Sequence, residues 1–232
     1  MTRQHVAVGL SGDGGDELFC GYSRYEYNET AWREIARIPL PVRTALRRLL
    51  ASTSGDSRNR LAPVMRRVLR VPPGEALNEW AERLAVPDRP SLYRRQMSNW
   101  IDPASVVLAS VEPATVLSKP STWPEVPDFE HLMMYVDTVS YLPDDILVKV
   151  DRATMAVGLE ARVPLLDHRI VELAARLPLR FKVRNGQSKW ILRQVLRRYV
   201  PPDLYERPKM GLGVPLDAWL RGPLRLWAEA LL

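Results

Sequence analysis

The segment from Val6 to Glu17, VAVGLSGDGGDE, constrains the fold more than any other part of the chain. Its apolar half, Val6–Leu10, is short and contains β-branched residues, so it predicts a buried strand of a parallel sheet. A polar loop follows, and Leu18 and Phe19 then begin an apolar-spaced segment that predicts a helix. Open α/β sheets bind their ligands at such strand–loop–helix junctions, beyond the carboxyl ends of the strands.

The residue types in this loop suit a phosphate that is bound together with a metal ion. Gly12, Gly14 and Gly15 lack Cβ, so the backbone can approach a ligand closely, and consecutive N–H groups in such turns bind anions. Asp13, Asp16 and Glu17 would repel a bare phosphate, but Mg²⁺ between carboxylate and phosphate removes that conflict. The loop therefore indicates a site for a magnesium nucleotide. A Gly/Asp-rich connector, or an aspartate that caps the next helix, explains the same residues without a ligand.

Composition restricts the class of protein. A chain of 232 residues forms one large domain or two small ones. No apolar run approaches the roughly 18 residues of a membrane span, and the first residues lack the layout of a signal peptide. The single cysteine, Cys20, cannot form an internal disulfide, which favours a reducing cytoplasm. We therefore predict a cytoplasmic protein without a membrane partner.

The net charge of +6 comes mainly from arginine, and arginines are concentrated between Arg33 and Arg70. Such a cluster is typical of a nucleic-acid-binding surface or of solvated helix faces. The basic residues are not interleaved with aromatic residues that look exposed, which favours the solvated faces. We predict no nucleic-acid partner.

Apolar periodicity and breaking residues define most of the remaining elements. We expect a surface loop over Ser52–Asn59 and an extended connector over Glu112–Pro127, which contains four prolines. The predicted helices are Tyr22–Leu50 with a break at Pro39 and Pro41, Leu61–Val71, Ala76–Leu84, Ser91–Trp100 and Glu130–Tyr141.

The segment Leu142–Asp167 predicts a helix followed by an extended stretch. Pro143 suits a first helical position, Gly158 ends the helix, and Glu160–Pro164 runs extended.

Three charged residues of this helix, Asp145, Lys149 and Arg152, lie at i, i+4 and i+7 and therefore share one side. They form either a charged wall that faces a nucleotide or an exposed helix pair worth about 0.3–0.5 kcal/mol.

The segment after this predicts a turn at Asn185-Gly186, an N-cap at Ser188 and a helix over Trp190–Tyr199. Lys189, beside the start of that helix, either reaches a phosphate or is an ordinary exposed lysine. The basic loop Tyr205–Pro215 is either a mobile lid over an anionic ligand or a plain connection.

In order and spacing, four of these stretches resemble the synthetase domain of glutamine-hydrolysing asparagine synthetases: Ser11–Tyr22, Leu142–Asp167, Ser188–Arg193 and Arg207–Gly211. The related β-lactam synthetases share the fold and the adenylation step. The resemblance covers nearly the whole chain. It implies an α/β, mostly helical fold: the remnant of a Rossmann-like parallel sheet, adenine nucleotide alpha hydrolase-like, with a helical C-terminal region.

The resemblance also implies the chemistry. Enzymes of this kind use ATP and Mg²⁺ to convert the side-chain carboxylate of aspartate to aspartyl-AMP, with release of pyrophosphate. Ammonia from glutamine then displaces AMP to give asparagine. Aspartate and ammonia are thus the expected substrates.

Roles transfer residue by residue. Asp13 matches the acidic residue needed around formation of the acyl-adenylate, and Lys189 matches a lysine near the α-phosphate and pyrophosphate. Asp16 matches a magnesium ligand. The resemblance implies cofactor contacts from Ser11, Gly12, Gly14, Lys149 and Arg152.

Two features of the family are missing from the sequence. Its glutaminase domain uses an N-terminal cysteine, whereas Met1 is followed here by Thr2, and the pyrophosphate loop Ser-Gly-Gly-x-Asp-Ser does not occur. We therefore predict that residues 1–232 are a partial synthetase domain, without glutaminase domain and pyrophosphate loop, and inactive in isolation. A homodimer would form through the missing parts. The alternatives are another amidotransferase ligase, including a β-lactam-synthetase-like one, a non-catalytic module with this fold, and a basic nucleic-acid-binding domain.

Overall fold

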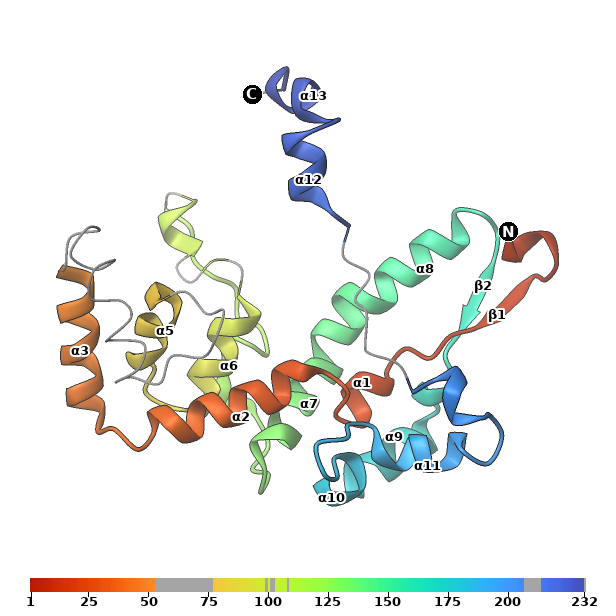
Figure 1. Ribbon diagram of the computed structural model, residues 1–232, viewed down its shortest axis with the longest axis horizontal. Helices are drawn as coiled ribbons and strands as arrows, with labels where there is room; N and C mark the ends of the chain where they lie inside the picture. The colour runs from red at the N-terminus through yellow and green to blue at the C-terminus, as the bar shows by residue number, and fades with distance from the viewer. Residues whose placement is uncertain (53–76, 99, 101–102, 108, 207–213, 232) are drawn as a thin grey trace. The chain divides into compact units, whose positions relative to one another are not determined.

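The computed structural model describes residues 1–52, 77–98, 100, 103–107, 109–206 and 214–231 (Figure 1). It divides into two compact units, residues 1–192 and 193–232. The predicted loop after Ser52, the predicted helix Leu61–Val71 and most of the predicted lid lie outside the described residues.

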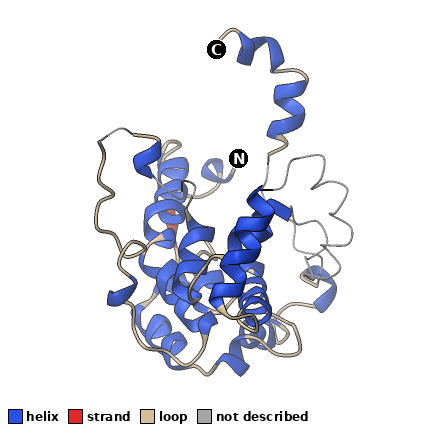
Figure 2. Ribbon diagram, turned by 90° about the vertical axis from the view of Figure 1, so that its left-hand side faces the viewer, coloured by secondary structure: helices blue, strands red, loops and turns tan. Residues whose placement is uncertain are grey.

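Helices make up most of the described chain, which confirms a mostly helical α/β fold (Figure 2). No helix among these residues is long and apolar enough to cross a bilayer. A π-helical turn, η4, spans Leu142–Leu147, and short 3-10 turns span Thr2–Gln4, Pro103–Ser105, Pro120–Thr122, Pro164–Leu166 and Pro202–Leu204. The α-helices are α1 Gly15–Leu18, α2 Ser23–Ile35, α3 Leu40–Ser52, α5 Leu77–Leu84, α6 Arg89–Met97, α7 Phe129–Val139, α8 Val148–Met155, α9 His168–Arg176, α10 Leu179–Lys182, α11 Trp190–Leu196, α12 Leu216–Arg221 and α13 Arg225–Glu229.

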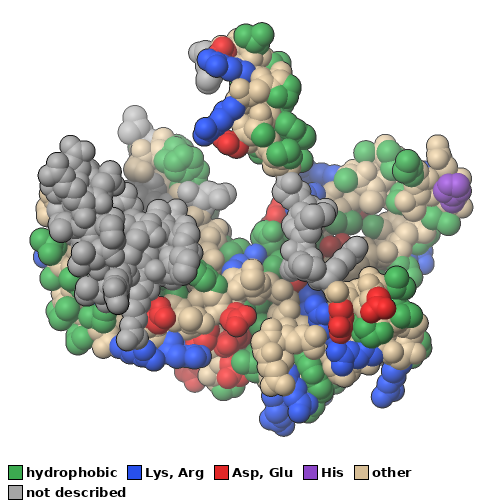
Figure 3. Space-filling view, in the orientation of Figure 1, with side chains coloured by type: hydrophobic (Ala, Val, Ile, Leu, Met, Phe, Trp, Pro, Cys, Tyr) green, Lys and Arg blue, Asp and Glu red, His purple; other side chains and the backbone are tan. Residues whose placement is uncertain are grey.

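The sheet consists of β1, Val8–Leu10, and β2, Glu160–Arg162, which run parallel with Val8 opposite Glu160. This confirms both predicted extended segments. The prediction that Val6–Leu10 is buried is wrong for this structure, since Leu10 is 77% exposed. In the described part of the chain β1 pairs with β2 alone, and a pair of strands cannot shield its own faces. Hydrophobic side chains are accordingly visible at the surface around these strands and α8 (Figure 3).

Several helix boundaries differ from the predicted ones. The helix after the Gly/Asp loop begins at Gly15 rather than Leu18 and ends after four residues. The long helix predicted from Tyr22 is indeed broken, but α3 starts at Leu40 and accommodates Pro41 in its first turn, where no intrahelical N–H is needed.

The turn predictions are confirmed with small shifts. Asn185 and Gly186 both have positive φ, and Arg184 and Gln187 exchange backbone hydrogen bonds across them. Gly158, at φ +71°, follows the end of α8. The helix predicted to be capped by Ser188 begins at Trp190, after Lys189 at φ +52°.

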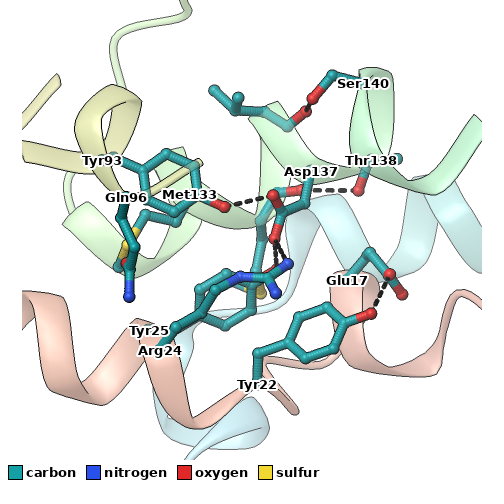
Figure 4. Close-up of polar contacts among 12 residues, drawn as sticks. Glu17, Tyr22, Arg24, Tyr25, Tyr93, Gln96, Met133, Asp137, Thr138 and Ser140 are labelled. Carbon is teal, nitrogen blue, oxygen red and sulfur yellow. Dashed lines mark hydrogen bonds and ion pairs between the residues drawn. The ribbon is translucent and has the colours of Figure 1, made fainter. Parts of the chain in front are cut away.

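The main hydrophobic core joins α2, α6 and α7, and contains the buried free thiol Cys20. At its centre the carboxylate of Asp137 is fully buried (Figure 4). It accepts hydrogen bonds from Arg24 Nη2 at 2.5 Å, from Tyr25 OH at 2.6 Å and from Tyr93 OH. A buried carboxylate is tolerated only when it is paired and hydrogen-bonded in this way. A second cluster, Leu18, Phe19 and Ala174, packs α1 against α9.

Candidate active site

The loop after β1 lies beyond the carboxyl ends of both strands, as predicted (Figure 1). Ser11 N donates to Arg162 O at 2.8 Å, so the parallel ladder extends into the loop. Gly15 N donates to Gly12 O at 3.3 Å and closes the turn that leads into α1.

Two of the loop glycines lie close to the segment after β2, and the backbone conformation of Gly14 also requires a glycine. Gly14 has φ +79°, and a Cβ built there would lie 2.5 Å from Leu166 Cδ2. A Cβ on Gly15 would lie 3.1 Å from Leu165 Cδ1. The segment after β2, which contains Leu165 and Leu166, therefore packs against the loop. A Cβ on Gly12 would have no atom within 4 Å among the described residues, so Gly12 is the glycine whose surroundings are open to a ligand.

The predicted catalytic lysine and metal ligand meet at this loop. Lys189 Nζ lies 2.9 Å from Asp16 Oδ2, although the two residues are far apart in the sequence. Both side chains are partly exposed, at 30% and 25%. Earlier on the same loop, Ser11 Oγ donates to Asp13 Oδ2 at 2.5 Å. The structure thus brings Lys189 to Asp16 and pairs Ser11 with Asp13.

Backbone contacts explain how Lys189 reaches Asp16. Lys189 N donates to Phe19 O at 3.2 Å, which fastens the segment before α11 to the end of α1. Gly21 N donates to Asp16 O at 2.8 Å. A Cβ on Gly21 would overlap both Lys189 Cε and Asp16 Oδ1.

No role was predicted for Gly21. The signal in the sequence is a glycine only five residues after Asp16, which is near enough for its backbone to contact that residue.

Glu17, by contrast, is directed away from this site. It is 2% exposed and accepts a hydrogen bond from Tyr22 OH at 2.7 Å (Figure 4). Burial raises the pKa of Glu17, and the bond from Tyr22 opposes this only in part. Tyr22 also carries the Arg24 guanidinium over its ring, 3.8 Å from the centroid. Glu17 is therefore an interior link between α1 and α2.

Lys149 and Arg152 lie on exposed positions of α8. Lys149 Nζ is 3.7 Å from Asp145 Oδ2, and both side chains are more than half exposed. This is the contact expected of a helix surface pair. A role of the two residues in nucleotide binding stays a prediction.

The donor set fits a magnesium ion that arrives with a nucleotide. The described residues contain no group of three or more His, Cys, Asp or Glu that could hold a metal by themselves. Mg²⁺ needs no such group, because it is usually bound through one or two carboxylates together with phosphate oxygens and water. Asp16, partly exposed and already opposite a cation, can serve as one such carboxylate, and Asp13 lies on the same loop.

Comparison with known proteins identifies the family of the chain. The family model described as asparagine synthase matches residues 1–232. The chain belongs to the asparagine synthase family. The resemblance inferred from the motifs is thereby confirmed.

Its curated relatives are considerably longer. A "Putative asparagine synthetase [glutamine-hydrolyzing]" of Mycobacterium tuberculosis H37Rv is 33% identical over 99% of this chain and 33% of its own length. Asparagine synthetase [glutamine-hydrolyzing] 1 of Bacillus subtilis is 28% identical over 100% of this chain and 34% of its own length. The chain thus spans about a third of these relatives. No solved structure matches it.

Proposed function

We propose that this asparagine synthase family chain contributes the metal and pyrophosphate end of the nucleotide site of an ATP-dependent ligase that makes asparagine. The observation that carries the proposal is the contact between Lys189 and Asp16. It sets a fixed cation and a carboxylate at the Gly/Asp loop, at the carboxyl end of a parallel strand pair. A metal-chelated triphosphate needs this combination of charges.

In the first step, an oxygen of the aspartate side-chain carboxylate attacks the α-phosphorus of ATP. The bond from that phosphorus to the bridging oxygen breaks, and pyrophosphate leaves with the electron pair. Lys189 stabilises the charge that develops on the leaving group, an effect typically worth a few kcal/mol. Asp16 would hold the Mg²⁺, which would neutralise the phosphates, and Asp13, which accepts a hydrogen bond from Ser11 Oγ, would be the acidic residue near the forming acyl-adenylate.

In the second step, ammonia attacks the acyl carbon of aspartyl-AMP. The acyl–oxygen bond breaks, AMP leaves, and the ammonium nitrogen loses a proton to give the neutral amide. The open surroundings of Gly12 leave room at the loop for the nucleotide during both steps.

The test is pyrophosphate release from ATP, aspartate and ammonia by the complete gene product. Lys189→Ala and Asp16→Asn should each lower the rate at least about a hundredfold, the size expected when a major electrostatic group is lost. Lys119→Ala removes an exposed lysine elsewhere and should have no effect. Wild-type turnover in either site variant would refute the assignment.

A different acceptor acid is the second candidate. Not all relatives of the chain are named asparagine synthetase: "Amidase chyE" of Penicillium rubens is 31% identical over 40% of the chain. Aspartate-dependent exchange of labelled pyrophosphate into ATP distinguishes the two. Exchange that requires another carboxylic acid, and is unaffected by aspartate, would favour the second candidate.

A further inference from the structure

A cavity of about 420 Å³ is lined by residues of α1, α7, α9 and α10, four helices whose places in the fold can be followed in Figure 1. Its wall is mostly apolar, and none of the predicted nucleotide or metal contacts lines it. The wall includes Leu18, Met134, Val139, Val171, Ala175 and Lys182.

Lys182 is the unusual member of this wall. It is the last residue of α10 and only 3% exposed. Within the described part of the chain its ammonium makes neither a hydrogen bond nor an ion pair. The titratable group that acts on it is the Cys20 thiol, whose own pKa burial raises to about 12, so that the thiol is neutral and supplies no counter-charge. Burial lowers its pKa to about 8. A buried ammonium without a counter-charge is strongly unfavourable, so an anion beside it would be stabilising.

The carboxylate and the imidazole on the wall are already engaged. Glu17 accepts the hydrogen bond from Tyr22. His131 contacts Asp128 Oδ2 through Nδ1 at 2.9 Å and Leu177 O through Nε2 at 3.1 Å. Among the described charged groups that line the cavity, Lys182 is therefore the one that can receive a ligand.

We propose that this cavity binds an amphipathic monocarboxylate, with its carboxylate on Lys182 and its hydrocarbon body against α7 and α9. The volume falls in the usual range for small-molecule sites, about 300–1,000 Å³, and apolar walls with one polar anchor are typical of them. The apolar side chains that face the body are Leu18, Met134, Val139 and Val171. The site is separate from Asp16 and Lys189, so this proposal does not depend on the ligase activity.

In the experiment, the complete gene product is titrated with octanoate in a calorimeter. 1-Octanol, which has the same chain length and no charge, is the control ligand. We expect saturable binding of octanoate, at least about tenfold tighter than that of 1-octanol, which corresponds to one useful charge contact. Lys182→Met, which keeps a long side chain but removes the charge, should abolish this preference.

A second variant keeps the test decisive if Lys182→Met does not fold. Ala175→Phe places a large side chain in the cavity from an exposed helix position and leaves Lys182 intact. It should abolish octanoate binding. The proposal is overturned if octanoate does not bind saturably to the wild type, as when another segment of a longer polypeptide fills the cavity. Equal affinity for octanoate and 1-octanol, or unchanged binding to Ala175→Phe, would overturn it as well.

Discussion

Gly21 is the residue on which the contact between Lys189 and Asp16 depends, because any side chain there would occupy the space of both partners. Its backbone also bonds to Asp16 O, which keeps the chain close at this point. The function of the loop is thus sensitive to a position that carries no chemistry of its own.

Gly21→Ala should therefore lower pyrophosphate release at least about tenfold and destabilise the fold by about 1–3 kcal/mol, the usual cost of overpacking. Gly9→Ala is the matched control, since its Cβ would lie 3.9 Å from Leu159 Cδ2, an ordinary contact, and should leave stability and activity unchanged. Urea unfolding and the pyrophosphate assay measure the two effects. Normal activity in Gly21→Ala would show that the contact between Lys189 and Asp16 does not depend on a glycine at this position.

Lys182 gives a prediction about pH. Its pKa of about 8 in the folded chain lies below its ordinary value of 10.5, so between these values the unfolded chain binds more protons. The contribution of Lys182 to stability is therefore least favourable below pH 8 and improves as the pH rises toward 10.5.

Lys182→Met should be more stable than the wild type at pH 7, and this advantage should shrink by roughly 1 kcal/mol per pH unit between pH 8 and 10. Urea unfolding at several pH values, without octanoate, measures the difference. Lys119→Met, at an exposed position, should show a difference that does not vary with pH. A constant difference for Lys182→Met would mean that the ammonium is not buried and unpaired.

At this scale, sequence patterns identified the residue types but not their surroundings. Ser11, Asp13, Asp16 and Lys189 could be predicted as site residues because a loop motif and a second motif occur in a known order. That Glu17 lies inside while its neighbour Asp16 is accessible follows from the direction in which α1 packs on α9, which local sequence does not encode.

At the scale of elements, Asp137 holds three helices together. It lies on α7 and receives its hydrogen bonds from α2 and α6. Asp137→Ala should destabilise the chain by about 3–5 kcal/mol, because it leaves Arg24 partly buried without its partner. Arg33→Ala breaks an exposed pair with Glu29 and should cost less than about 1 kcal/mol. Thermal unfolding of both variants checks this, and equal losses would contradict it.

Elements with clear periodicity were predicted well and short ones were not. α5 and α7 lie within one or two residues of their predicted ranges, because an apolar stripe of two or three turns defines them. α1 has four residues and no stripe, so its start was misplaced. β1 and β2 could be predicted as extended, but their exposure depends on neighbours that single segments do not specify.

At the scale of the whole molecule, the chain leaves much apolar surface uncovered around its strands. Leu10 is 77% exposed, and Val6 and Val8 lie beside it. Exposed apolar patches of this kind favour association. Residues 1–232 alone should therefore associate in a concentration-dependent way, and Leu10→Gln should reduce this without a loss of stability. Light scattering compares the wild-type residues 1–232 with the Leu10→Gln variant, and identical association of the two would refute the expectation.

The contact between Asp16 and Lys189 also has a consequence for ligand order. On the proposed assignment, a divalent ion that binds Asp16 has to displace the Lys189 ammonium, and a nucleotide that binds Lys189 has to displace the Asp16 carboxylate. Whichever ligand arrives first releases the group that the second one needs. Such thermodynamic linkage is reciprocal, so the affinity for either ligand should rise by the same factor when the other is present.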